Sequence, residues 1–101
     1  MSTDPVDLDT QSNTMREIEQ ARQNRIRTRT EDTKWLMTSK RGRRIVWATL
    51  AEAGVYQSSF NPDPIQMAFN QGLRDSGLKL LAEIVKTCPD LHNQMILEGG
   101  K

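Results

Sequence analysis

"SKRGRRIVWATLAEAG", residues 39–54, is the stretch that decides the fold of this 101-residue chain. Ser39 is a short polar residue of the kind that caps a helix N-terminus, and Gly54 stands where helices commonly end in a left-handed residue. The residues between them with the i, i+4, i+7 spacing of a buried helix face are Val46, Leu50 and Ala53. The stretch therefore predicts an amphipathic helix that packs against other helices.

The sequence downstream of this helix predicts two more helices. Asp63 precedes Pro64, which combines a capping residue with a proline at the first helical position, and apolar residues then recur every three or four positions to about Thr87. Pro89 opens a last short helix that Gly99 and Gly100 end. No segment alternates with the period of a strand. We predict an all-α domain over residues 32–98, a small bundle of three to four helices that includes a short helical turn around residue 35.

The N-terminal third differs in composition from this domain. Residues 1–13 are polar and without periodicity, which predicts a flexible arm. Residues 14–31 contain helix-forming residues with few apolar anchors, which predicts a basic helical extension that is marginal by itself. The alternating segment RIRTRT, residues 25–30, leaves an extended conformation open as the alternative.

Composition excludes several classes of function. The single Cys88 and the single His92 leave no disulfide framework within the chain and no multi-cysteine or histidine-pair zinc site. The glycines are too dispersed for a phosphate-binding loop. No apolar stretch approaches the roughly 20 residues that span a bilayer, and the N-terminus lacks the features of a signal peptide. We expect a cytoplasmically made protein with no enzymatic activity, no metal, no cofactor and no membrane partner.

Residues 48–64, ATLAEAGVYQSSFNPDP, superficially resemble a DNA-reading helix-turn-helix. In that motif the residue four before the turn glycine is small, but here it is Leu50. Pro62 would also fall inside the recognition helix, where proline removes an amide hydrogen bond and costs about 3 kcal/mol. We therefore interpret the stretch as a helix end followed by a loop.

Basic residues are concentrated in the middle of the chain. Residues 14–44 carry ten basic and four acidic side chains, a net +6, between an acidic start (net −3 over residues 1–13) and a C-terminal part of net −2. The candidate contact residues are Arg25, Arg27, Arg29, Lys40, Arg41, Arg43 and Arg44. Guanidinium groups at this density suit phosphates or an acidic protein surface equally well. A solvated helix start is the simpler alternative, although positive charge is mildly unfavourable at that end of a helix.

The large apolar side chains are interpreted as helix-packing residues. A tryptophan in a helical stripe more often belongs to a core than to a base-stacking surface. The predicted packing positions are Trp35, Trp47, Leu50, Phe60, Phe69 and Gly72. Ala68, Gly72 and Ser76 also follow one another at i+4 steps, which would let a second helix approach closely.

The motif WLMTSKRGRRIVWATLAEAGVYQSSF, residues 35–60, resembles a family of small proteins encoded in the structural gene cluster of tailed bacteriophages. The similarity continues through Ala68-Phe69, the GLKLLAEI run that begins at Gly77, and Cys88 to Leu91, and it covers about residues 33–98. One departure is QGLR, residues 71–74, where the family pattern has a second base after the glycine.

The resemblance implies a virion or virion-assembly component, and our leading hypothesis is a phage structural protein, located in the virion and made in the host cytoplasm. It would dock in multiple copies, as a ring or decoration, on portal or tail-connector proteins through its N-terminal arm and arginine-rich cluster, with possible contact to packaged DNA. The alternative is a non-specific nucleic-acid-binding internal or packaging accessory protein of the phage. A transient assembly chaperone is a third hypothesis.

Overall fold

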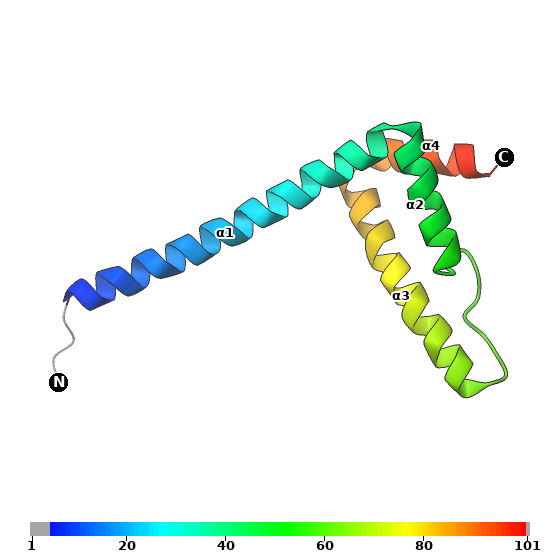
Figure 1. Cartoon of the computed structure of the whole chain (residues 1–101), viewed down its shortest axis with the longest axis horizontal. Coiled ribbons are helices and arrows are strands. Elements are labelled where there is room, and N and C mark those ends of the chain that lie inside the picture. The colour runs from blue at the N-terminus through cyan, green and yellow to red at the C-terminus, as the bar shows by residue number, and fades with distance from the viewer. Residues whose placement is uncertain (1–4, 101) are drawn as a thin grey trace. The chain divides into compact units, whose positions relative to one another are not determined.

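A computed structural model describes the backbone of residues 5–100 and the side chains of residues 10–100. It contains four helices: α1 (Pro5–Thr38), α2 (Lys40–Glu52), α3 (Pro64–Thr87) and α4 (Pro89–Gly99) (Figure 1). The described residues form no strand, so the predicted all-α fold is confirmed.

The chain divides into two compact units, Met1–Asp32 and Thr33–Lys101. The predicted helical domain began one residue before the second unit. In the first unit the structure differs from the predicted arm over residues 1–13, because the backbone is already helical at Pro5. Proline is tolerated there, since the amides of a first helical turn have no partner within the helix. Residues 25–30 are helical as well, so the alternative of an extended conformation is wrong. The first four residues of the predicted arm lie outside the described residues.

A sharp corner joins α1 to α2. The short separate helix predicted around Trp35 is instead the end of α1, which stops at Thr38. Ser39 then caps α2 as predicted, because its Oγ accepts a hydrogen bond from the Gly42 amide at 2.9 Å. A Cβ at Gly42 would overlap the carbonyl oxygen of Leu36, so the two helices meet this closely only where the side chain is absent.

The other predicted helix boundaries are confirmed. Gly54 follows α2 with a φ of 80°, and Asp63 Oδ1 accepts a hydrogen bond from the Ile65 amide at 3.0 Å at the start of α3. Residues 53–63 contain no helix, which excludes a recognition helix after Gly54.

The core of the second unit takes one fully buried side chain from each helix: Met37, Leu50, Ile84 and Met95. Val46, Val55 and Cys88 complete it. Helix α2 packs against both α3 and α4, and α3 packs against α4. A hydrogen bond of 2.9 Å from Thr33 Oγ1 to Glu83 Oε1 adds a polar link between the last turns of α1 and α3. Each large apolar side chain buried in this way contributes roughly 1.5–3 kcal/mol.

Several predicted packing residues do not pack within the chain. Trp35, Phe60 and Phe69 are 77%, 72% and 62% exposed, and a Cβ placed on Gly72 would meet nothing within 4 Å. The physical reason is the small size of the core, which on α3 buries only Gly77 and Ile84. Apolar periodicity predicted a buried face of α3, but much of that face is exposed among the described residues. Leu50 is fully buried and Trp47 is half-buried.

The two interior glycines of α3 are expected to respond oppositely to alanine. A Cβ on Gly77 would lie 2.5 Å from Val55 Cγ2 and 2.8 Å from Ala53 Cβ, so Gly77→Ala should lower the free energy of unfolding by about 2 kcal/mol through overpacking. Gly72→Ala should raise it by roughly 0.5–1 kcal/mol, because alanine favours the helix and the site is open. Urea unfolding at one chain concentration measures both. Equal destabilisation by the two variants would contradict the packing at Gly77.

Candidate functional site

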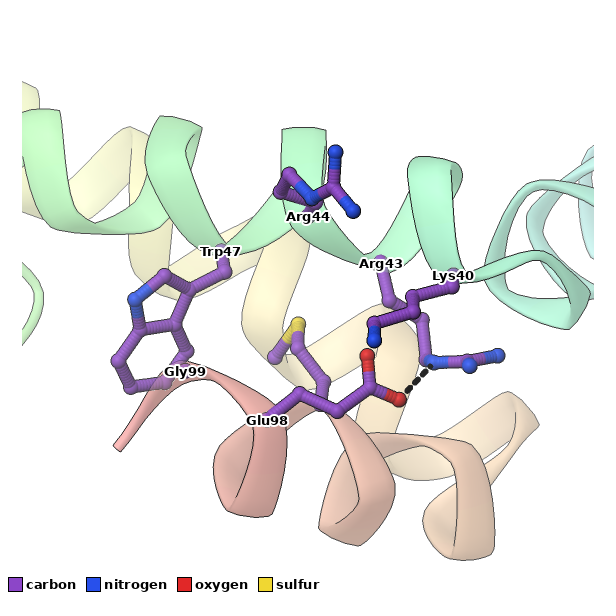
Figure 2. Close-up of a pocket in the computed structure, with 7 residues that line it drawn as sticks. Lys40, Arg43, Arg44, Trp47, Glu98 and Gly99 are labelled. Atoms are coloured by element: carbon purple, nitrogen blue, oxygen red, sulfur yellow. Dashed lines mark hydrogen bonds and ion pairs between the residues drawn. The ribbon is translucent and has the colours of Figure 1, made fainter. Parts of the chain in front are cut away.

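The first turn of α2 carries the basic cluster that the sequence singled out. Lys40, Arg41 and Arg44 are exposed, whereas the side chain of Arg43 is only 11% exposed. Arg43 Nε donates a hydrogen bond of 2.9 Å to Glu98 Oε1 on α4, and Figure 2 shows this pair bridging the two helices. The second guanidinium contact is to the end of α1.

Arg43 closes the C-terminus of α1. One of its terminal nitrogens, Nη1, donates to the carbonyl oxygens of Met37 and Thr38, each at 2.9 Å. The last carbonyls of a helix have no partner within the helix, so the guanidinium satisfies groups that would otherwise need water. The structure thus shows Arg43 in contacts within the chain, whereas the sequence predicted a contact with a partner or a phosphate there. The Arg43–Glu98 pair could not be predicted from the sequence, because the two residues are 55 positions apart and no local motif links them.

The electrostatics of Glu98 follow from this pair. Partial burial would raise the pKa of Glu98, but hydrogen bonds from Gln94 and Arg43 and the charges of Arg43 and Lys40 together lower it below its ordinary value of 4.5. Glu98 is therefore ionised at neutral pH.

A small pocket of about 90 Å³ lies beside the Arg43–Glu98 pair. Its lining residues are Lys40, Arg43, Arg44, Trp47, Met95, Glu98 and Gly99. The Trp47 ring closes one side and stacks on Tyr56, with ring centroids 4.8 Å apart and planes at 26°. The arginine and the glutamate satisfy each other across the pocket (Figure 2), so the charge that remains for a partner is on Lys40 and Arg44 at its rim.

The upstream arginines lie on α1 in the first unit. Residues 10–32 contain no buried side chain. A stripe with the 3-4-4-3 spacing of one helix face combines apolar and basic residues, namely Met15, Ile18, Arg22, Ile26 and Arg29. Arg22 pairs with Glu19 at 3.1 Å. By the same helical geometry Arg25 borders this stripe and Arg27 lies on a different face, so the structure does not bring all three predicted arginines together.

An exposed apolar face of α3 is the surface that sequence reasoning misassigned to the core. Ile65, Phe69 and Leu73 are 82%, 62% and 43% exposed and follow one another at i+4 steps. The small residues Ala68, Gly72 and Ser76 form the adjacent row and are exposed too. The apolar run was visible in the sequence, but its exposure was not.

The described residues bear on metal ligands, the single thiol and membrane-spanning helices. Between residues 10 and 100 no three His, Cys, Asp or Glu side chains gather as a metal site would require. Burial raises the pKa of the Cys88 thiol, and the nearby charge of Lys34 lowers it only in part, so the sulfur stays protonated at neutral pH. No described helix combines the length and apolar character needed to cross a bilayer.

Removing the Arg43 side-chain contacts should destabilise the second unit. We expect Arg43→Met to lower the free energy of unfolding by about 2 kcal/mol, because it leaves two helix-end carbonyls and Glu98 without their charged partner. The exposed neighbour provides the control: Arg41→Met should change stability by less than about 0.5 kcal/mol. Chemical denaturation of both variants measures this, and similar effects at the two positions would rule out the internal role of Arg43.

The Glu98 pair also predicts a pH dependence. Because folding lowers the pKa of Glu98, its contribution to stability is complete above about pH 4.5 and is lost as the pH falls through the folded-state pKa. Glu98→Gln should therefore be less stable than the native chain at neutral pH, and the difference should shrink in acid. Thermal unfolding of both proteins between neutral pH and about pH 3 tests this. A difference that is independent of pH would show that the charge of Glu98 is unimportant.

Comparison with known proteins identifies the family. A family model described as Bbp19-like phage protein matches residues 33–96, which is nearly the whole second unit. No curated protein and no solved structure matches the chain. The matched segment contains the α1–α2 corner, the basic first turn of α2 and the complete core. The chain is a phage protein that belongs to the Bbp19-like family.

Proposed function

We propose that this phage protein is a structural component of the virion that docks in multiple copies on the portal or head-to-tail region. The helical domain supplies the fold of each copy. The N-terminal helix contacts a neighbouring chain, and the exposed basic residues of α2 contact acidic surfaces of the connector.

The exposure of the N-terminal helix carries this proposal. Over residues 10–32 nothing is buried, and Met15, Ile18 and Ile26 are 71%, 61% and 50% exposed. A mostly polar helix without tertiary contacts is only marginally stable in water. Apolar side chains at helical spacing on such a segment are typical of a helix that completes its packing on another protein.

The basic residues favour an anionic surface. Lys40, Arg41 and Arg44 are exposed around the start of α2, where their charges repel the positive end of the helix dipole. An acidic partner would relieve that repulsion. The same cations suit DNA phosphates, but a phosphate backbone offers no cover for the apolar side chains of α1. We therefore favour a protein surface over nucleic acid as the partner.

Quantitative mass spectrometry of purified virions tests this function. Particles are measured before and after DNA ejection, with the portal protein as the internal standard for copy number. We expect a fixed copy number, in a simple ratio to the portal, that is retained in emptied particles.

The other outcomes identify the alternatives. Loss on ejection would indicate an internal protein that leaves with the DNA, and absence from both particles would indicate an assembly factor. For nucleic-acid binding, the affinity of the purified chain for duplex DNA should fall log-linearly with salt. The triple variant Lys40→Gln, Arg41→Gln, Arg44→Gln should then bind more weakly and show a shallower salt slope.

A further inference from the structure

We infer that the neighbouring chain that receives the N-terminal helix is a second copy of this protein, and that the receiving surface is the exposed face of α3. The α1 stripe of one copy, centred on Ile18 and Ile26, would pack on Ile65, Phe69 and Leu73 of the next copy. This assignment rests on the proposed multi-copy function and names the partner of its N-terminal helix.

The donor surface is apolar at its centre and basic along its edge. Met15, Ile18 and Ile26 project from one face of α1, and each is at least half exposed. Arg25 and Arg29 lie beside and on the same face, where the arginine stems add apolar length while their heads stay charged, and Arg22 on this face is paired with Glu19. A partner must therefore offer apolar contacts together with negative charge.

The receiving surface has both properties. Ile65, Phe69 and Leu73 form an apolar row on the first half of α3, and all three side chains remain exposed. Asp63 comes just before Ile65 at the start of this row, and Asp75 borders the adjacent row of small residues, Ala68, Gly72 and Ser76; both aspartates are exposed. Asp63 Oδ1 accepts from the Ile65 amide and Asp75 Oδ1 accepts from Gln71 Nε2, so the positions of both carboxylates are fixed by hydrogen bonds. The α1 stripe therefore has basic residues at its edge, and the α3 surface made of the apolar row and the small-residue row has an acidic residue at its start and another at its side.

The dimensions of the two surfaces agree. At a rise of about 1.5 Å per residue, the row from Met15 to Ile26 is about 16 Å long and the row from Ile65 to Leu73 is about 12 Å long. The row beside Phe69 contains Gly72, where a Cβ would meet nothing within 4 Å, so a second helix can approach the backbone of α3 there. Gly72 lowers the stability of α3 within one chain, but between two chains it allows close helix packing.

The two surfaces differ, so the contact is heterologous. Each copy donates its α1 stripe to one neighbour and offers its α3 face to the other, and repetition closes a ring or extends a filament. An isologous dimer, in which α3 faces pair with each other, would leave α1 without a partner. The distinction between these two modes can be tested by mixing variants.

The experiment uses the full chain in sedimentation velocity and multi-angle light scattering over a range of concentrations. Ile18→Glu disables the donor surface and Phe69→Glu disables the receiving surface. Both side chains are exposed, so both variants should keep the thermal stability of the second unit. Asn24→Glu on another face of α1 and Thr49→Glu, exposed on α2, are the matched charge controls.

We expect the native chain and both controls to self-associate with rising concentration, and each disabled variant to remain monomeric when alone. An equimolar mixture of Ile18→Glu and Phe69→Glu should form a 1:1 heterodimer, because one intact surface of each kind remains. The heterodimer should also weaken at high salt, since charge pairs flank the contact.

Three results would overturn the inference. These are a native chain that stays monomeric at all concentrations, a variant that associates as the native chain does, or a mixture that stays monomeric. Self-association of Ile18→Glu alone, with Phe69→Glu monomeric, would point to isologous pairing of α3 faces. None of them bears on whether virions contain the protein, so failure of this inference is separable from failure of the proposed function.

Discussion

The guanidinium group of Arg43 is the interaction on which the rest of the second unit depends. It joins the carbonyl oxygens of Met37 and Thr38 at the end of α1 to the Glu98 carboxylate on α4, while its own backbone belongs to α2. Three helices are thus fixed at one corner by hydrogen bonds of 2.9 Å to a charged group, which are stronger than neutral ones. The corner sets the direction in which α2 leaves α1, and with it the faces of α2 that meet α3 and α4.

The small core explains why so much apolar surface is left over. A chain of this size buries only about 60–65% of the surface that it exposes when unfolded. Here four fully buried side chains and their neighbours fill the space between the helices, and Phe60, Ile65 and Phe69 remain outside. Exposed apolar groups in this arrangement are typical of a protein that completes its packing in an assembly. The proposed assembly would cover the exposed apolar side chains of α1 and α3.

The candidate site shows what residue type alone predicts about the contacts of a side chain. The sequence singled out seven basic residues, and the structure divides them. Arg43 holds the fold together, Lys40, Arg41 and Arg44 remain exposed on α2, and the others lie on α1. Composition detects positive charge but not its partner, because the glutamate that neutralises Arg43 is distant in sequence. Trp35 and Phe69 were predicted to pack in the core because they are apolar, but both are exposed.

The sequence by itself determined the helical class, the caps at Ser39 and Asp63, the turn at Gly54 and the exclusion of a helix-turn-helix. These features rest on hydrogen bonds and backbone preferences that span only a few residues. Only the tertiary structure decided which apolar rows are covered, that α1 is one helix from Pro5 to Thr38, and that Arg43 faces inward. Which side chains are buried and which distant residues pair depends on how the helices pack around the small core. The periodicity of apolar residues along one helix does not specify that packing.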